Sequence, residues 1–309
     1  MTDLEVPARP PEDRLLSRLV AMVQTIRPHQ WVKNVFVLAP VVFAKEAFAP
    51  ALLVRAGSAF LVFCLLAGAV YTLNDILDRD ADRAHPLKRA RPIASGRVPL
   101  AWAKVLALVL IVVALSGAAA VGLAFALVAA TYFAQNVLYS FKLKHVAYLD
   151  VSFIAAGFVL RVMGGGYATR IPVSGYLLLC TALLALFLGF GKRRHELGAA
   201  ANAGAQRHAL QSYSRQGLDI ALFVTAAATV ATYLSYTLDE HTRAFFRTDW
   251  LWLSTLFVVL GVMRFLHIVR NRPEAESPTQ EMLKDGPFVA IMLGWVVAVM
   301  WVVYNLRPS

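Results

Sequence analysis

Long apolar runs separated by short charged segments make up most of the chain. A transmembrane helix needs about 20 predominantly apolar residues, and several of these runs approach or exceed that length. The pattern therefore predicts an all-α, polytopic membrane protein with nine transmembrane helices in one bundle. The expected spans are about 31–47, 52–73, two spans within 102–141, 146–166, 175–191, 219–238, 250–268 and 288–306.

Two of these spans depend on particular residues. The run 102–141 is too long for one crossing, so we divide it near Gly117–Gly122. In the first span Pro40 is expected to kink the helix, because proline has no backbone N–H to donate.

The segment before the first span has two parts. Residues 1–13 are rich in proline and charge, which is typical of a disordered tail. Between residues 14 and 27 apolar residues recur at helical spacing, with Arg14 and Arg18 off the apolar stripe. This pattern predicts an amphipathic helix in the membrane interface. Residues 14–309 are then expected to form a single membrane domain.

Composition supports the same class of protein. Hydrophobic residues make up 59% of the chain, and the mean hydropathy is +0.60. The net charge is +11, but no basic segment is interleaved with aromatic residues, so we expect no nucleic-acid partner. Cys64 and Cys180 both lie inside apolar runs, which indicates neither a disulfide framework nor a cysteine metal site.

The lysines and arginines indicate how the spans are oriented. With nine spans and the N-terminus in the cytoplasm, 22 of the 30 fall on the cytoplasmic side and 6 on the other side. Cytoplasmic loops carry an excess of Lys and Arg, so we expect the N-terminus inside and the C-terminus outside.

The most charged segment between the apolar runs is Asn74–Arg97, directly after the second span. Asn74, Asp78 and Asp82 are four residues apart, and Asp75 lies beside them. On a helix this spacing keeps side chains on one face. Hard oxygen ligands suit Mg²⁺, which binds protein carboxylates together with substrate phosphates. We predict that these four residues form a catalytic magnesium site; the alternative is a solvated, charged helix end.

These residues carry a family resemblance. Asn74, Asp75, Asp78 and Asp82, followed by Arg91-Pro92 and Ser95-Gly96, resemble the signature of UbiA-type intramembrane prenyltransferases. The resemblance covers about residues 27–285. It implies a nine-helix bundle in which the acidic segment binds a Mg²⁺-diphosphate at the cytoplasmic mouth of a cavity open to lipid.

The chain departs from the general family pattern after the sixth span. Members typically carry a second Asp-rich motif there, whereas this chain has Lys192-Arg193-Arg194-His195-Glu196. Together with RPHQWVKN and YSFKLKHVAYLD, this segment is similar to the decaprenyl-phosphate phosphoribosyltransferase branch. That resemblance implies transfer of 5-phosphoribosyl from phosphoribosyl pyrophosphate (PRPP) to a polyprenyl phosphate. It also implies a bacterial cell membrane and a role in cell-wall arabinan synthesis.

Further cations and polar residues are candidates for substrate binding. Those flanking the acidic motif could neutralise diphosphate oxygens, although Lys88 and Arg91 could equally be membrane anchors. The candidates after the sixth span stand where the second Asp-rich motif is missing. They could also be membrane anchors, because basic residues commonly follow the cytoplasmic end of a span. The candidates are Arg83, Lys88, Arg91, Lys192, Arg193 and Glu196.

A second group lies at the end of the fourth span and in the fifth. Tyr139, Lys142 and Lys144 match a family segment that lines the pocket; two lysines two apart do not share a helix face, and we favour Lys144. Asp150 is expected to accept ribose hydroxyls or complete the metal shell, with a helix N-cap as its alternative role. Arg161 lies within a span, where charge is functional by default, so we predict phosphate contact over a structural ion pair.

Two residues near the C-terminus are weaker candidates. Arg264 could reach the membrane surface from the eighth span. Asp285 is the best candidate for a contact in the 272–287 loop, which could act as a lid.

Two other functions remain open from the sequence. An ordinary family member would transfer a prenyl group from its diphosphate to an aromatic acceptor, but the second Asp motif is missing. A transporter of polyprenyl-phosphate lipids would be expected to show internal repeats and paired broken helices, which we do not find. The sequence leaves open whether the protein forms a homo-oligomer.

Overall fold

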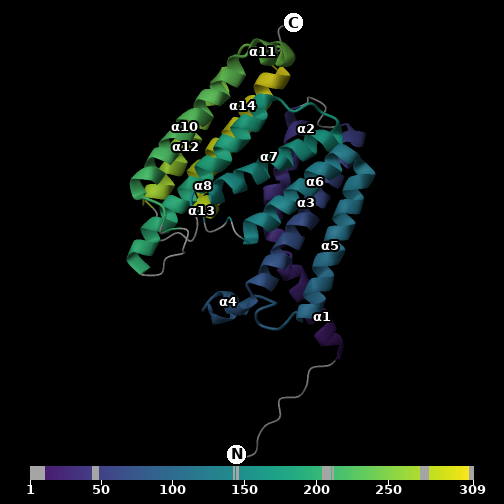
Figure 1. Ribbon diagram of the computed structural model, residues 1–309. Helices are drawn as coiled ribbons and strands as arrows, with labels where there is room; N and C mark the ends of the chain where they lie inside the picture. The colour runs from purple at the N-terminus through teal and green to yellow at the C-terminus, as the bar shows by residue number, and fades with distance from the viewer. Residues whose placement is uncertain are drawn as a thin grey trace, which may run out of the picture. The chain divides into compact units, whose positions relative to one another are not determined.

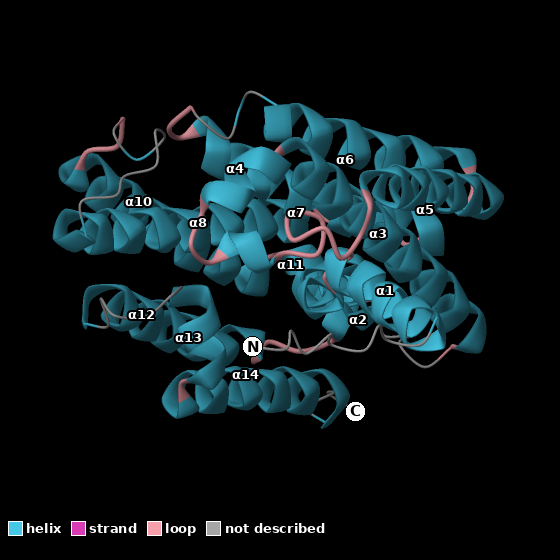
Figure 2. Ribbon diagram, turned by 90° about the horizontal axis from the view of Figure 1, so that it is seen from below, coloured by secondary structure: helices cyan, strands magenta, loops and turns pink. Residues whose placement is uncertain are grey.

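Helices make up nearly all of the structure, as the apolar runs predict. The computed structural model describes residues 11–43, 49–141, 143, 146–203, 210, 212–271 and 278–305. No strand occurs among these residues, as Figure 2 shows. The all-α prediction is confirmed.

The helices form two compact units, and the chain passes between them at the end of α6 (Leu123–Phe141), within α7 (Leu149–Thr169) and after α7. The first unit comprises Met1–Ser140 and Leu160–Pro172, and the second comprises Phe141–Val159 and Val173–Ser309. Figure 1 follows the helices along the chain. Besides α7 these are α1 (Pro11–Thr25), η1 (Pro28–Leu38), α2 (Ala39–Phe43), α3 (Pro50–Leu77), α4 (Arg79–Ala84), η2 (Lys88–Ala90), α5 (Leu100–Val121), α6 (Leu123–Phe141), α8 (Gly175–Ala203), α10 (Arg215–Leu238), α11 (Glu240–Phe246), η4 (Leu251–Ser254), α12 (Thr255–Asn271), α13 (Pro278–Lys284) and α14 (Gly286–Asn305).

Seven helical segments within the described residues are long and apolar enough to cross a membrane. They are α3, α5, α6, α7, α10, the Gly175–Gly198 part of α8, and η4 continued by α12. The predicted division of 102–141 is confirmed, because Gly122 has an extended backbone (φ 157°, ψ 154°) that ends α5. The predicted ninth span corresponds to the shorter apolar helix Gly286–Val302.

The first predicted span, 31–47, is not one α-helix in the described residues. Its described part consists of the 3-10 helix η1 and the short helix α2, and residues 44–48 lie outside the description. Pro40 has no N–H to donate to the carbonyl of Phe36, which instead accepts from the N–H of Ala39. The segment before Pro40 therefore forms a tighter 3-10 helix, and the predicted kinked α-helix is wrong here.

The predicted interfacial helix 14–27 corresponds to α1, and apolar residues along it are exposed, among them Leu15, Leu16 and Leu19. Of the predicted disordered tail, 1–13, residues 1–10 lie outside the described residues. Residues 11–13 belong to α1, so the prediction is wrong for them.

Small side chains bring the helices of the first unit together. On α5 the buried residues recur every three or four positions, with alanine at 103, 107, 114 and 118. α5 packs along α3, whose buried face also carries alanines. Small residues allow such close approach of membrane helices, because van der Waals packing is the main attraction between them in lipid. Phe63 of α3 then contacts the rings of Phe125 and Tyr132 on α6.

Two glycines of the run 164–166 on α7 allow close contacts in this unit. A Cβ at Gly165 would lie 1.9 Å from the carbonyl oxygen of Val37, and one at Gly164 would lie 2.6 Å from the ring of Phe63. The run therefore serves close packing of η1 and α3, as predicted, and not a phosphate-binding loop.

The second unit is built from α8, α10, α12 and α14. α8 packs against α10 and α12, and α12 packs against α14. Phe187 and Phe265 meet at a centroid distance of 5.0 Å in the core.

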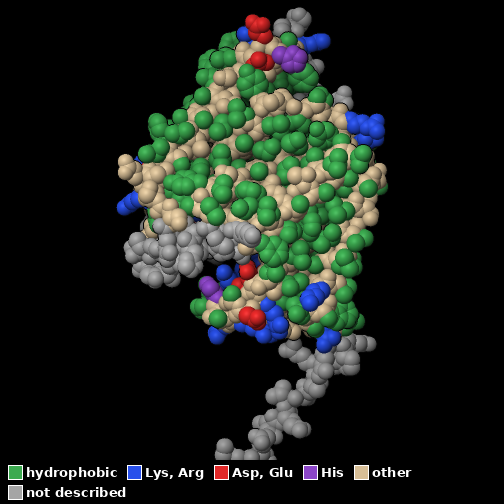
Figure 3. All heavy atoms as spheres, viewed as in Figure 1, with side chains coloured by type: hydrophobic (Ala, Val, Ile, Leu, Met, Phe, Trp, Pro, Cys, Tyr) green, Lys and Arg blue, Asp and Glu red, His purple; other side chains and the backbone are tan. Residues whose placement is uncertain are grey.

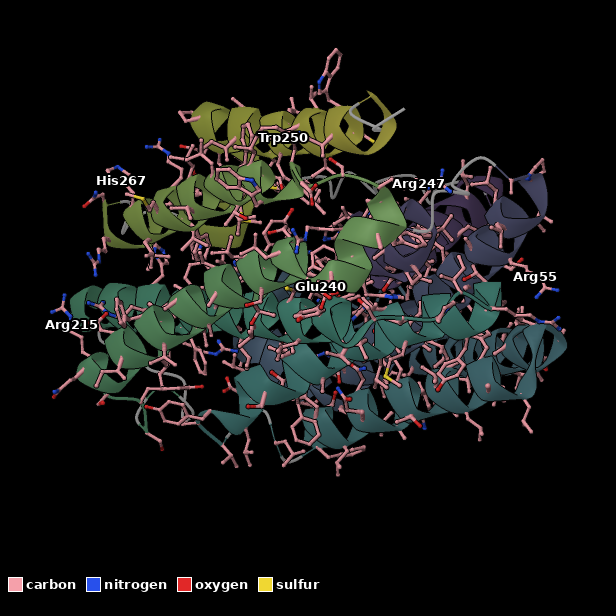
Figure 4. The ribbon with its side chains drawn as sticks, turned by 90° about the horizontal axis from the view of Figure 1, so that it is seen from above. Arg55, Arg215, Glu240, Arg247, Trp250 and His267 are labelled. Carbon is pink, nitrogen blue, oxygen red and sulfur yellow. The ribbon has the colours of Figure 1, made fainter. Side chains whose placement is uncertain are left out.

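In Figure 3 hydrophobic side chains cover the helix faces, and charged side chains gather around α4 in the first unit and α11 in the second. Figure 4 shows Arg215 at the start of α10 and Glu240 at the start of α11.

An ion pair between Arg264 and Asp285 joins α12 to the start of α14. Arg264 Nε and Nη2 donate to the two oxygens of Asp285 at 2.9 and 2.8 Å, and the N–H of Phe288 donates to the same carboxylate at 2.9 Å. Asp285 is buried. The structure thus gives Arg264 a protein partner, whereas the sequence suggested a side chain reaching the membrane surface. Residues 272–277 of the predicted lid lie outside the description.

We expect Asp285→Ala to lower the thermal midpoint more than Asp285→Asn does. Asparagine keeps an oxygen for the Phe288 N–H, a cap contact typically worth about 1 kcal/mol, but loses the charge that pairs with Arg264. Tryptophan fluorescence melting in detergent measures both variants. Equal midpoints for the two variants would show that the cap contributes nothing.

Candidate functional site

The predicted acidic segment lies at the junction of α3 and α4. α3 ends at Leu77 and α4 begins at Arg79, with Asp78 between them in a non-helical conformation (φ −89°, ψ 6°). The helix on which the spacing of the acidic residues was considered is therefore interrupted at Asp78. The N–H groups of Asp78 and Asp82 still donate to carbonyls four residues earlier, each at 2.8 Å. The helical spacing of the row thus persists through the interruption.

Two of the predicted ligands converge on one atom. Arg91 Nη1 donates to Asp75 Oδ1 at 3.2 Å and to Asp82 Oδ2 at 2.7 Å. Asp75 is 2% exposed and Asp82 is 3% exposed. Two buried carboxylates repel each other unless a cation lies between them, and here the guanidinium of Arg91 supplies that charge.

A second arginine holds Asp75 from another direction, and sequence reasoning did not select it. Arg27 Nη2 donates to Asp75 Oδ1 at 2.5 Å, and its guanidinium lies 5.0 Å from the centroid of the Tyr71 ring. Arg27 occupies the turn between α1 and η1 with a left-handed backbone, φ 50°. Its place at the start of RPHQWVKN was the only signal in the sequence.

The donor set here fits Mg²⁺. The carboxylates of Asp75 and Asp82 already share a cationic nitrogen, and Mg²⁺ typically binds through one or two carboxylates plus substrate phosphates. Among the described residues no three His, Cys, Asp or Glu side chains gather into a group that could hold a metal by themselves. A metal here would therefore need ligands beyond the protein carboxylates, such as phosphate oxygens or water.

The other candidates near this segment are less enclosed. Arg83 is exposed, donating from Nε to the carbonyl of Ala94 at 3.0 Å. Lys88, Asn74 and Asp78 are half-buried. Tyr139 is also half-buried, near the end of α6. Lys142 and Lys144 lie outside the described residues.

Arg161 is the centre of a buried polar network in the first unit. Its Nε donates to Asn34 Oδ1 and its Nη2 donates to the Tyr132 hydroxyl, both at 2.7 Å. The Asn34 amide in turn donates to Cys64 Sγ at 3.3 Å. Arg161 is 8% exposed and Asn34 is fully buried. Sequence reasoning selected Arg161 but missed Asn34 and Tyr132. Asn34 lies at the end of the RPHQWVKN segment and Tyr132 lies within an apolar run, and neither is marked as a partner of Arg161.

The segment that replaces the second Asp motif lies on α8 in the second unit. Arg193 Nε donates to Asp150 Oδ2 at 2.7 Å, and Arg193 Nη1 donates to Glu196 Oε2. Lys192 Nζ lies 3.9 Å from Glu196 Oε1. Asp150 and Arg193 are buried, whereas Lys192 and Glu196 are partly exposed. Arg193 therefore binds protein carboxylates, where the sequence suggested substrate phosphate.

Asp150 has further partners at the start of α7. Its Oδ1 accepts from the N–H of Val151 at 2.8 Å and from the hydroxyl of Tyr213. An N-cap side chain accepts from an N–H two or three residues later, so the contact with Val151 is not that of a standard N-cap. Burial, followed by the bond to Asp150, raises the pKa of Tyr213. Tyr213 therefore remains a protonated donor at neutral pH.

Comparisons with known proteins bear on the family to which the chain belongs. The family model for the UbiA prenyltransferase family matches residues 35–283. The chain is 36% identical over 301 residues to decaprenyl-phosphate phosphoribosyltransferase from Mycobacterium tuberculosis, covering 96% of this chain and 97% of the relative. It is 34% identical over 288 residues to the Corynebacterium glutamicum protein of that name, covering 92% and 86%.

A solved structure shares the fold. The UbiA homolog from Archaeoglobus fulgidus bound to DMAPP and Mg²⁺ matches with a TM-score of 0.66 at 19% identity, covering 92% of this chain and 99% of that chain. With its apolar helices, the protein is a multi-pass membrane protein. The family model, the near full-length relatives and the shared fold agree, and the chain belongs to the UbiA prenyltransferase family.

Proposed function

We propose that the protein transfers the 5-phosphoribosyl group of PRPP to a polyprenyl phosphate, such as decaprenyl phosphate, with release of pyrophosphate. The similarity over nearly the whole chain to two decaprenyl-phosphate phosphoribosyltransferases supports this choice of substrates. At the site, the observation that carries the proposal is that Asp75 and Asp82 share one nitrogen of Arg91.

Asn74, Asp75, Asp78 and Asp82 are the proposed residues for holding Mg²⁺ on the diphosphate of PRPP. Bound there, Mg²⁺ would neutralise charge on the departing pyrophosphate. Arg91, Arg83 and Lys88 are proposed to contact the oxygens of the leaving group. Arginine suits this task because its planar guanidinium can donate two hydrogen bonds to one phosphate.

The nucleophile in this proposal is an oxygen of the lipid phosphate, which is anionic at neutral pH. No strong general base is therefore required. The bond from the ribose C1 to the pyrophosphate oxygen breaks as the bond to the lipid phosphate oxygen forms. A single in-line displacement inverts the configuration at C1, so α-configured PRPP gives a β-linked product.

The residues of the second cluster are proposed to bind the rest of PRPP or the lipid phosphate. Lys192 and Glu196 are the partly exposed members, and Asp150 and Arg193 are buried behind them in the hydrogen-bond network. Tyr139, Lys142, Lys144 and Arg161 are further proposed contacts. Arg161 contacts Asn34 and Tyr132, so it would reach a phosphate only as part of that network.

The proposed location is a bacterial cell membrane, with the N-terminus and the acidic segment on the cytoplasmic side. The unequal distribution of Lys and Arg supports this orientation. The proposed product would supply lipid-linked pentose for cell-wall arabinan synthesis.

One assay tests the proposal. Purified protein is incubated with Mg²⁺, labelled PRPP and polyprenyl phosphate, and the label in the organic phase is counted. We expect transfer by the wild type, and we expect its loss when Mg²⁺ is chelated or when Asp78 is changed to asparagine. Label recovered on the α anomer would contradict a single displacement.

Parallel incubations address the two other functions. A prenyltransferase would instead couple a labelled prenyl diphosphate to an aromatic acceptor. A transporter would move polyprenyl-phosphate lipid between the leaflets of vesicles without forming a product. Either result in the absence of phosphoribosyl transfer would overturn the proposal.

A further inference from the structure

Tyr213 lies where the chain enters α10, and its hydroxyl contacts the start of α7. The hydroxyl accepts from the N–H of Tyr148 at 2.8 Å and donates to Asp150 Oδ1. Tyr213 is 6% exposed and Asp150 is fully buried. One hydroxyl therefore serves as both acceptor and donor, which fixes the direction of its O–H bond.

The conformation and the neighbours of Tyr148 position its backbone N–H for the hydrogen bond to the Tyr213 hydroxyl. Tyr148 has φ 67°, a left-handed conformation that costs a non-glycine residue on the order of 1 kcal/mol. The rings of Tyr148 and Tyr213 lie 4.8 Å apart between centroids. A Cβ at Gly217 would lie 2.5 Å from the Tyr148 hydroxyl, so the first turn of α10 also confines Tyr148. The Tyr148 N–H is thereby directed at Tyr213.

The hydrogen bonds continue from Tyr213 to the surface of the cluster. Asp150 accepts from Tyr213 on one oxygen and from Arg193 Nε on the other, at 2.7 Å. Arg193 Nη1 then donates to Glu196. Burial decreases along this chain: the side chain of Asp150 is 1% exposed, that of Arg193 is 9% exposed and that of Glu196 is 22% exposed.

We propose that Tyr213 is a positioning residue for the transfer reaction, acting through Asp150 and Arg193 to orient the carboxylate of Glu196. Glu196 is the substrate-contacting member of the chain, and its carboxylate accepts hydrogen bonds from the ribose hydroxyls of PRPP. This inference rests on the proposed function and deepens it. It gives Arg193 a structural role in orienting Glu196 in place of direct phosphate binding.

The arrangement directs the donors of Arg193 at protein carboxylates. Its Nε donates to Asp150 and its Nη1 donates to Glu196, and the side chain is buried. The same two bonds fix the plane of the guanidinium, and a fixed plane orients Glu196. Positioning groups of this kind typically contribute 10–100-fold to binding or activity at metal sites, which sets the expected scale.

The test compares Tyr213→Phe with Tyr233→Phe. Tyr233 is a matched control in the same unit, because its hydroxyl also makes two hydrogen bonds, with Ser254 at 2.8 Å and from Trp295 at 2.9 Å. We expect Tyr213→Phe to raise the KM for PRPP about tenfold and to leave kcat within about threefold of the wild type. The lost contact is expected to stabilise bound PRPP and the transition state equally, and such a loss changes KM and not kcat. Tyr233→Phe is expected to leave KM and kcat unchanged, even if it lowers the thermal midpoint as much as Tyr213→Phe does.

A double-mutant cycle tests the route through Glu196. If Tyr213 acts by orienting Glu196, then Tyr213→Phe combined with Glu196→Gln raises the KM for PRPP no further than Glu196→Gln alone. Additive effects would overturn the inference, as would an unchanged KM in Tyr213→Phe.

A binding readout separates this inference from the proposed function. Mg²⁺ and PRPP without lipid acceptor should raise the thermal midpoint of the wild type, because a ligand that binds only the folded state stabilises it. No shift in the wild type contradicts the proposed function itself. A normal wild-type shift that is equally large in Tyr213→Phe contradicts only the role of Tyr213.

Discussion

Replacing Asp82 with asparagine is expected to reduce phosphoribosyl transfer by about 100-fold or more. Removing a group that only supports a metal ligand typically lowers metal affinity or activity 10–100-fold. Removing a proposed ligand itself should therefore lower activity by at least 100-fold. Asparagine keeps the shape of the side chain but removes the charge. Asp82 is buried and shares a cation with Asp75, so the lost charge is not replaced by solvent.

Asp80 provides the matched control for Asp82 on the same short helix. Its side chain is 91% exposed, and its ion pair with Arg83 is long, at 3.9 Å. Exposed pairs of this kind contribute little, so Asp80→Asn should transfer at the wild-type rate. Initial rates of label transfer, measured across a Mg²⁺ titration, give the comparison. If Asp82→Asn and Asp80→Asn lose activity equally, the loss comes from the changed net charge of the segment, and the metal-site assignment is wrong.

Replacing Gly165 with alanine is expected to disrupt the first unit. The new Cβ would lie 1.9 Å from the carbonyl oxygen of Val37 and 2.9 Å from its carbonyl carbon. The clash involves backbone on both sides, so no side-chain rotation relieves it. Ordinary overpacking costs about 1–3 kcal/mol, and we expect a larger loss here. Separation of η1 from α7 would also disturb Asn34 and, through it, Arg161.

Gly57 is the control for Gly165. It lies on α3 in the same unit, and a Cβ there would meet no atom within 4 Å. Because alanine has a higher helix propensity than glycine, Gly57→Ala should be neutral or slightly stabilising. Size-exclusion profiles and fluorescence melting in detergent measure both variants. A Gly165→Ala protein that melts like the wild type would show that η1 does not pack on α7 as the structure has it.

The network around Arg161 shows one limit of prediction from sequence. A charged residue inside an apolar run is conspicuous, so Arg161 was selected without a structure. Asn34 and Tyr132 come from segments 127 and 29 residues away along the chain, and nothing local marks them as its partners. Hydrogen bonds between distant segments depend on how the helices pack, and helix packing is not encoded in local spacing.

Arg27 and Tyr213 show the same limit at the two clusters. Both residues lie at the ends of helical elements, where the sequence offers no periodic pattern. Arg27 reaches Asp75 across 48 residues, and Tyr213 reaches Asp150 across 63. The sequence selected Asp75 and Asp150, and it also selected Arg91 and Arg193, which pair with them, but it did not select Arg27 or Tyr213.

Hydrophobic runs were enough to establish an all-helical membrane protein and most of its spans, and the spacing of the acidic segment was enough to predict a site for a metal-bound diphosphate. These properties depend on the composition of contiguous residues, which the sequence displays directly. The tertiary structure alone decided that Pro40 is preceded by a 3-10 helix, that Asp78 interrupts the acidic row and that arginines pair with Asp75, Asp82 and Asp150. The ion pairs depend on contacts between separate segments, whose free energies are set by packing and burial.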